Sequence, residues 1–186
     1  SLGVISWSRC FVWKNGEALW NDTIRRYPYL AQPYFYRANY YFEKGDWQRA
    51  LQDNKHALWL DPRYSYAYRL EGEIARQRGN LPEALVKYSQ AVQLGFQHER
   101  DLEETLNNRG IIYEDMGEEV LAVADYSEVL RRNPEALFPL LNRGNVYMKR
   151  QEWQKALADF QAALKVDPGN AFAAGNSQKI IKILLR

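Results

Sequence analysis

The chain has 186 residues, a formal net charge of +2, an apolar fraction of 46% and a single cysteine, Cys10. A charge so close to zero gives no electrostatic case for nucleic acid or direct membrane contact, so neither is expected for this domain. One cysteine rules out an internal disulfide and leaves the redox compartment open. The sequence has no evident signal peptide and nothing near the ~20 consecutive apolar residues of a spanning helix.

Residues 1–30 are predicted to form a partial repeat. Trp13 and Pro28 stand 34 residues before Trp47 and Pro62. The latter two belong to a 34-residue unit, residues 31–64, that recurs along the chain. The segment RCFVWKNGEALWNDTIRRYP also resembles the opening of repeat arrays that follow the membrane region of some glycosyltransferase-like proteins. An ordinary half repeat that caps the array is the simpler interpretation.

Residues 31–64 show the unit most clearly. Small residues Ala38, Ala50 and Ala57 alternate with aromatic ones, Gly45 divides the unit and Pro62 closes it. Apolar side chains at helical intervals on both sides of Gly45 predict two short helices joined by a turn. Neither helix can bury its apolar face alone, so neighbouring units must stack on this one.

The same landmarks return in residues 65–98, 103–136 and 137–170, and residues 171–186 follow as a C-terminal capping helix. The step to the third full unit needs four additional residues. Four residues make about one helical turn, so we expect Glu99–Leu102 to extend the first helix of that unit. The last helix is unusually apolar at Ile180, Ile181, Ile183, Leu184 and Leu185, which makes self-association through it an expectation.

In spacing, small residues and closing prolines the chain resembles the tetratricopeptide repeat (TPR) family. The resemblance implies an all-α fold, an α-α superhelix, that is, a right-handed solenoid of helix-turn-helix repeats forming one domain over residues 1–186. Three positions depart from the pattern: Phe96 stands in place of proline, Glu119 in place of an aromatic residue and Gln151 in place of the turn glycine.

A search for catalytic chemistry finds no candidate. His56 and His98 are each isolated, Cys10 has no local base, and no phosphate-binding, dinucleotide-binding or zinc-protease motif occurs. His98 and Asp101 would need further ligands to hold a metal. We therefore expect no enzymatic activity, no metal site and no cofactor.

The family resemblance implies that the first helix of each unit lines a concave groove with its residues 2, 5, 6, 9, 12 and 13. The wall predicted in this way comprises Gln32, Phe35, Tyr36, Asn39, Phe42, Glu43, Tyr66, Arg69, Leu70, Glu73, Arg76 and Gln77, followed by Glu104, Asn107, Asn108, Ile111, Glu114, Asp115, Phe138, Leu141, Asn142, Asn145, Met148 and Lys149. The peptide-binding candidates among these are Phe35, Tyr36, Asn39, Phe42, Tyr66, Arg69, Glu73, Asn108, Asn142 and Asn145. Its acidic residues outnumber its basic ones by five to three, so a mildly basic segment with an apolar anchor is the expected ligand.

Asn108 and Asn142 occupy equivalent places, and one amide can both donate to and accept from a peptide backbone. This resembles the asparagine ladder of the O-linked N-acetylglucosamine transferase family, although Tyr36 and Leu70 stand where further rungs would be. The alternative is that Asn-Arg-Gly is a common sequence in the middle of this helix and has no binding role. The basic residues of a clamp for chaperone tails are missing, so that mode is not expected.

The sequence favours a non-enzymatic scaffold that binds an extended or helical protein segment in its groove. The alternative is a substrate-recruiting or regulatory domain of a larger, membrane-bound, glycosyltransferase-like enzyme. The parent sequence would separate the two, since several spanning segments just before Ser1 would favour the second. A soluble domain in the cytoplasm or periplasm fits both, and the sequence leaves the compartment undecided.

Overall fold

The structure is a computed structural model that describes residues 16–185. Cys10, Trp13 and the rest of residues 1–15 lie outside the described part, as does Arg186. The predicted partial repeat is therefore described only from Gly16 onward.

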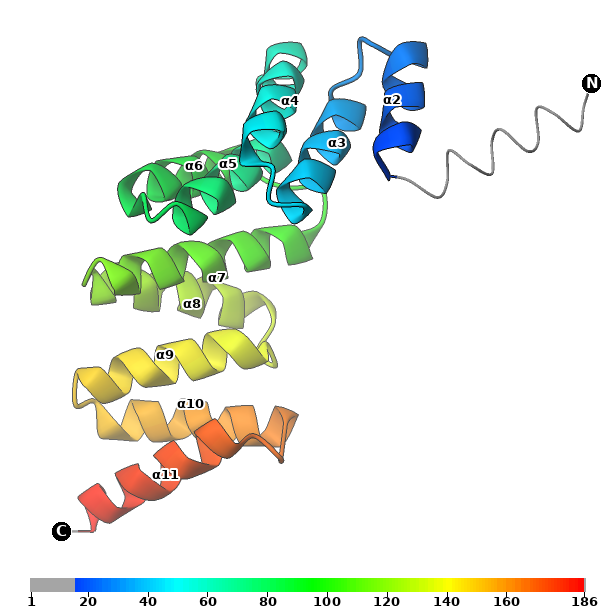
Figure 1. Cartoon of the computed structure of the whole chain (residues 1–186). Helices are drawn as coiled ribbons and strands as arrows, with labels where there is room; N and C mark the ends of the chain where they lie inside the picture. The colour runs from blue at the N-terminus through cyan, green and yellow to red at the C-terminus, as the bar shows by residue number, and fades with distance from the viewer. Residues whose placement is uncertain (1–15, 186) are drawn as a thin grey trace, which may run out of the picture. The chain divides into compact units, whose positions relative to one another are not determined.

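The chain divides into two compact units, Ser1–Phe96 (unit 1) and Gln97–Arg186 (unit 2). Unit 1 contains α2 (Gly16–Arg26), α3 (Ala31–Glu43), α4 (Trp47–Leu60), α5 (Ser65–Gln77) and α6 (Leu81–Leu94). Unit 2 contains α7 (Glu99–Asp115), α8 (Glu119–Arg132), α9 (Leu137–Lys149), α10 (Trp153–Val166) and α11 (Ala171–Leu184). The helices follow one another as antiparallel pairs, α3 with α4, α5 with α6, α7 with α8 and α9 with α10 (Figure 1). Over residues 16–185 no strand occurs, and the prediction of an all-α fold is confirmed.

Short turns with a left-handed residue join the two helices of each pair. Gly45, Gly79 and Gly117 have φ of 75°, 76° and 80°, a region that glycine enters without a Cβ clash. Gln151 takes the same place between α9 and α10 with φ of 59°. This turn is strained, because the left-handed conformation costs an L-residue such as Gln151 about 1–2 kcal/mol.

The helices of each pair cross where the eighth residue of the repeat unit, which lies in the first helix, meets the second helix. A Cβ built on Gly72 would lie 3.1 Å from Tyr88, one on Gly110 would lie 2.6 Å from Tyr126, and one on Gly144 would lie 3.1 Å from Phe160. These three rings are fully buried, and the glycines let the helices approach closely enough to cover them. The predicted close packing through small residues is thus seen at these crossings.

The crossing of α3 with α4 is packed differently. Ala38 stands at the glycine position and Asn54 at the ring position, and both are fully buried. Asn54 donates from Nδ2 to the carbonyl oxygen of Ala67 in α5 at 2.9 Å. Its amide oxygen has no hydrogen-bond partner within residues 16–185.

Each pair also carries an ion pair between residues sixteen apart. Arg37, Arg109 and Arg143 each bind an aspartate with two parallel N–H···O bonds, to Asp53, Asp125 and Asp159 respectively, at 2.6–2.9 Å. In the α5–α6 pair the charges are reversed, with Lys87 Nζ 2.7 Å from Glu71 Oε2. Their hydrogen bonds to these aspartates raise the pKa of Arg109 and of Arg143, so both guanidinium groups stay charged. Sequence reasoning missed these pairs, which hold the two helices of a pair in register.

Helix α7 has 17 residues, whereas α3, α5 and α9 have 13. The additional residues lie at its start, where Glu99–Leu102 form one more turn, as the four-residue step in the sequence predicted. Arg132 at the end of α8 binds Glu99 through Nη1 at 2.8 Å, which ties the new turn to its partner helix. None of the helices within residues 16–185 combines the length and the hydropathy that a membrane-spanning segment requires.

Candidate functional site

In unit 1 the predicted wall residues form part of a continuous run of aromatic rings. Trp20 of α2 stacks on Tyr36 of α3 with ring centroids 4.7 Å apart and an interplanar angle of 19°. Phe35 contacts Tyr36 and Tyr66, with centroids 5.5 Å and 6.1 Å away. Tyr66 in turn meets Phe96 edge-on at 5.2 Å. We call these five residues, together with Tyr64, the aromatic run.

The members of the aromatic run differ in what they offer to a ligand. Tyr36 is 44% exposed, so a partner can reach its ring. Phe35 is only 6% exposed and lies in the core of unit 1, where Tyr64 packs against its edge at 5.2 Å. Phe35 therefore supports the exposed ring of Tyr36 from the side of the core. Burial raises the pKa of Tyr64, which stays neutral at physiological pH.

Charged groups lie beside the aromatic run on α5. The guanidinium of Arg69 lies 5.6 Å from the centroid of Tyr66 and 5.8 Å from that of Phe96, within the range of cation–π attraction. Glu73 accepts from Arg76 Nη2 at 2.5 Å and from Tyr88 Oη at 2.6 Å. Burial alone would raise the pKa of Glu73, but these two hydrogen bonds outweigh it and the pKa is lowered. Glu73 is thus a fixed, ionised carboxylate.

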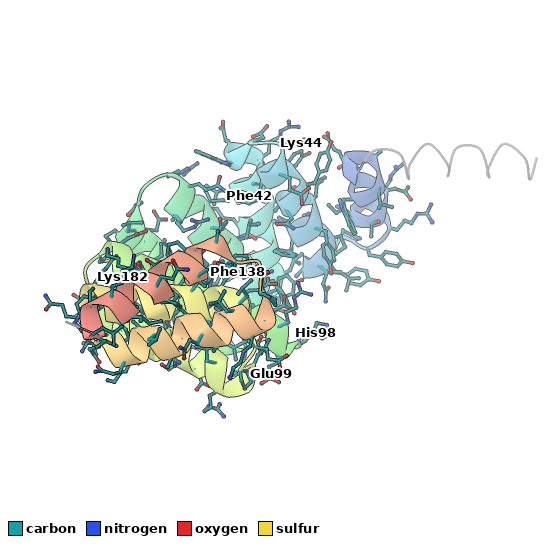
Figure 2. All side chains as sticks on the ribbon, turned by 90° about the horizontal axis from the view of Figure 1, so that it is seen from below. Phe42, Lys44, His98, Glu99, Phe138 and Lys182 are labelled. Atoms are coloured by element: carbon teal, nitrogen blue, oxygen red, sulfur yellow. The ribbon has the colours of Figure 1, made fainter. Side chains whose placement is uncertain are left out.

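The other two candidates of unit 1 lie on α3. Asn39 and Phe42 are half-buried, and Phe42 packs against the core of the unit. Phe42 and Lys44 lie at the end of the helix (Figure 2).

Amides and one carboxylate occupy the predicted wall in unit 2. Asn142 donates from Nδ2 to Asn107 Oδ1 at 3.1 Å, and Asn145 donates to Glu114 Oε1 at 3.1 Å. Lys149 binds the same oxygen of Glu114 at 2.6 Å. A side-chain amide has two N–H donors and an oxygen with two lone pairs, so each asparagine keeps capacity for a peptide backbone.

The amide of Asn108 differs from its neighbours. Among the residues that the structure describes, it makes no side-chain hydrogen bond, and it is half-buried. The equivalent Asn142 has one of its two N–H donors engaged by Asn107. An approaching backbone would therefore meet one uncommitted amide and one that is already oriented.

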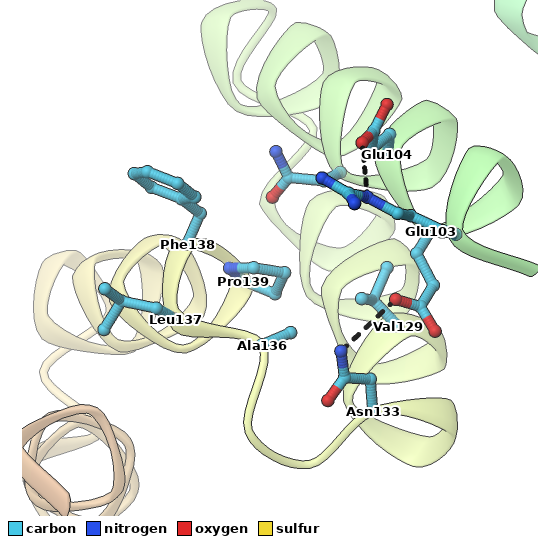
Figure 3. A pocket seen from close by; sticks show the side chains of 10 residues that line it. Glu103, Glu104, Val129, Asn133, Ala136, Leu137, Phe138 and Pro139 are labelled. Atoms are coloured by element: carbon cyan, nitrogen blue, oxygen red, sulfur yellow. Dashed lines mark hydrogen bonds and ion pairs between the residues drawn. The ribbon is translucent and has the colours of Figure 1, made fainter. Parts of the chain in front are cut away.

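Unit 2 also has a cavity of about 470 Å³ that sequence reasoning did not foresee. It lies between the start of α7, the end of α8 and the start of α9 (Figure 3). Three predicted wall residues, Glu104, Asn107 and Phe138, line it. The sequence placed them on one face, but the cavity depends on the residues of α8 and of the α8–α9 connection.

The histidines are not joined by other metal-binding groups. The ring of His56 lies against that of Tyr34, with centroids 4.2 Å apart and an interplanar angle of 34°. His98 is the N-cap residue of α7, next to Glu99, and its side chain makes no capping hydrogen bond (Figure 2). Within residues 16–185 no group of three His, Cys, Asp or Glu side chains is placed to hold a metal. The described surfaces are suited to binding through rings, amides and fixed charges.

Comparison with known proteins places this geometry in context. The tetratricopeptide repeat family matches the chain at residues 35–95 and 139–170. Among curated proteins, the Photosystem I assembly protein Ycf3 of Synechococcus sp. (strain CC9605) is 39% identical over 70 residues, and that of strain WH7803 is 38% identical over 71 residues. Each match covers 38% of this chain and only 40% of the relative's length.

Solved structures show the same fold at low identity. YrrB, a TPR protein with an unusual peptide-binding site, has a TM-score of 0.76 at 21% identity over 88% of this chain and 82% of its own. Pseudomonas aeruginosa pilF has a TM-score of 0.79 at 17% identity, over 98% and 81% respectively. The first TPR of Spaghetti (RPAP3), solved with an HSP90 peptide, has a TM-score of 0.60 at 19% identity, over 68% and 97%. The predicted helical solenoid of such repeats is confirmed by these likenesses.

Proposed function

Because the chain belongs to the tetratricopeptide repeat family, we propose that it is a non-enzymatic scaffold that binds an extended protein segment on its first-helix face. The observation that carries this proposal is the aromatic run of unit 1. Its stacked pair Trp20 and Tyr36 presents an exposed ring on a rigid base, the arrangement that concentrates binding energy at protein interfaces. Peptide binding in YrrB and in the Spaghetti domain supports the same use of the fold.

The two units would contribute in different ways. By itself, unit 1 offers rings that suit apolar side chains of a bound segment. Unit 2 offers Asn108, Asn142 and Asn145, which suit backbone amides without reading sequence. The acidic excess of the predicted wall favours a mildly basic segment, and salt should weaken its binding modestly.

The likeness to Ycf3 supports a more specific role, in which the bound segment belongs to a protein complex under assembly. The match is confined to 40% of the relative's length, so the proposal extends to complex assembly and not to any particular complex. A recruiting domain of a larger glycosyltransferase-like enzyme stays the alternative. The parent gene separates the two, because a catalytic region with spanning segments before Ser1 would favour the enzyme.

The experiment is a peptide array probed with the wild-type protein and with Tyr36→Ala. Removing the exposed ring should weaken the strongest peptides about tenfold, which is about 1.4 kcal/mol. Tyr29→Ala is the matched control, because Tyr29 is 68% exposed but lies in the connection between α2 and α3. Asn142→Ala should weaken all bound peptides by a similar factor, because this amide is expected to contact the peptide backbone and not its side chains. Recovery of the same peptides at the same strength by all three variants would refute the proposal.

A further inference from the structure

The cavity of unit 2 owes one of its walls to the additional turn of α7. Arg100, in the turn Glu99–Leu102, lines the cavity, as do Glu103 and Glu104 immediately after it. One contact to α8 and one within α7 hold this turn. Arg132 of α8 binds Glu99, and Thr105 Oγ1 donates to the carbonyl oxygen of Asp101 at 2.6 Å. The cavity wall is therefore preformed.

Apolar groups form the base of the cavity. Val129 of α8 is almost fully buried, and Ala136 in the α8–α9 connection and Leu137 and Pro139 at the start of α9 also line the cavity. Phe138 rises beside them and is 70% exposed (Figure 3). An exposed phenyl ring over an apolar base leaves hydrophobic surface in water, which an apolar side chain of a partner would cover favourably. The volume lies within the roughly 300–1,000 Å³ usual for ligand pockets.

The rim of the cavity is polar, with an excess of negative charge. Glu104 accepts from Arg100 Nε at 3.2 Å, and Glu103 accepts from Asn133 Nδ2 at 3.4 Å. The charged residues that line the cavity are thus one arginine and two glutamates. An acidic ligand would meet these carboxylates, whereas a lysine or arginine would add a favourable charge pair.

We propose that this cavity is an anchor pocket, which takes one apolar side chain of the bound segment when the neighbouring residue of that segment is basic. The inference rests on the proposed function and names the partner motif. A single aliphatic side chain fits because the base is apolar and the polar groups are confined to the rim. The pocket belongs to unit 2 alone, since all its lining residues lie between Arg100 and Pro139.

The test measures binding of the whole chain to fluorescent peptides that differ only in a central pair within a serine–glycine background: Leu-Lys, Leu-Glu or Ser-Lys. Leu-Lys should bind best. Phe138→Ala should weaken Leu-Lys about tenfold and leave Ser-Lys unchanged. Glu104→Lys should reverse the preference between Leu-Lys and Leu-Glu. Both side chains are exposed, so neither variant should unfold the protein, and circular dichroism checks this.

Phe172→Ala is the matched control, because Phe172 is a 52% exposed phenylalanine at the start of α11, outside the cavity. If Phe138→Ala binds like the wild type while Tyr36→Ala is weakened, the anchor pocket is wrong and the scaffold function stands. If neither variant changes binding, or if no peptide binds at all, both proposals fail. Equal losses in Phe138→Ala and Phe172→Ala would also overturn the pocket.

Discussion

The crossing of α3 with α4 and the crossing of α7 with α8 occupy the same place in their pairs but are packed by different chemistry. Between α7 and α8, Gly110 makes room for the ring of Tyr126. Between α3 and α4, Ala38 faces Asn54, whose amide reaches to the next helix and binds Ala67. The comparison teaches that the fold constrains the pair of residues at a crossing, and that a larger first partner is accompanied by a smaller second one.

The largest effect is expected from Gly110→Leu, because even a Cβ at this position lies 2.6 Å from the ring of Tyr126. Forcing the helices apart should cost about 3 kcal/mol, at the upper end for overpacked cores. Gly175→Ala in α11 is the control, since nothing lies within 4 Å of its Cβ position. Urea unfolding followed by circular dichroism should show a lower midpoint for the first variant and a slightly higher one for the second. Equal stability of Gly110→Leu and the parent would refute this packing.

The second-largest effect on stability is expected at the crossing of α3 with α4, where Ala38 and Asn54 occupy facing positions. Asn54→Tyr alone should destabilise the protein by about 2 kcal/mol, since Ala38 leaves no room for the ring. Ala38→Gly in addition should recover at least about 1 kcal/mol, as expected for residues in direct contact. A double-mutant cycle in urea measures this coupling. Strict additivity of the two changes would mean that the crossing does not act as a unit.

The reversed ion pair offers a third comparison. Lys87→Asp should place a carboxylate beside that of Glu71. The repulsion should lower the free energy of unfolding by about 1–2 kcal/mol, because both side chains of the native pair are largely buried. The double variant Glu71→Arg/Lys87→Asp restores the orientation found in the other three pairs and should regain the loss. Thermal melts decide the matter. A double variant no better than Lys87→Asp would show that the α5–α6 pair requires its own charge order.

A smaller gain is expected at the left-handed turn of the α9–α10 pair. Gln151→Gly should stabilise the protein by about 0.5–1 kcal/mol, because the relief of strain at φ of 59° exceeds the entropy that glycine adds to the unfolded chain. The mirror change, Gly117→Gln, should destabilise by a similar amount. Melting temperatures that shift in the same direction in both variants would contradict the interpretation that Gln151 strains the turn.

Self-association through α11 stays a prediction with no expected effect on folding. Ile180 is buried, while Ile181, Leu184 and Leu185 are exposed. Sedimentation at several concentrations should show a shift to larger species that Leu184→Glu abolishes. A strict monomer in both proteins removes the idea.

The apolar framework could be predicted from the sequence because each crossing needs small residues at fixed steps along the chain. The buried small residues Ala38, Ala50 and Ala57 and the additional turn of α7 were predicted in this way, and they occupy the positions expected. The sixteen-residue ion pairs carry an equally regular signal, opposite charges at one spacing in all four pairs. The predicted repeat did not include them, because it rests on the apolar and small residues alone.

The candidate site was predictable to a lesser degree. Repeat geometry placed Phe35 and Tyr36 together on the wall, but it could not tell that Phe35 is covered by Tyr64. Nor could it anticipate the cavity, whose shape depends on how Val129 and Ala136 of one pair approach Phe138 of the next. Burial and cavities arise from three-dimensional contacts between side chains, which a position in a repeat does not determine.

Arg143 has a consequence for the order in which unit 2 comes apart. Its guanidinium binds Asp159 of α10 and also donates to Ser127 Oγ of α8 at 2.9 Å, so one cation bridges three consecutive helices. Opening any of them would leave a half-buried charge without its partners, which is costly. Backbone amides of α8, α9 and α10 should therefore exchange their hydrogens with deuterium as one cooperative block, whereas α11, which lacks such a bridge among its described contacts, should exchange sooner.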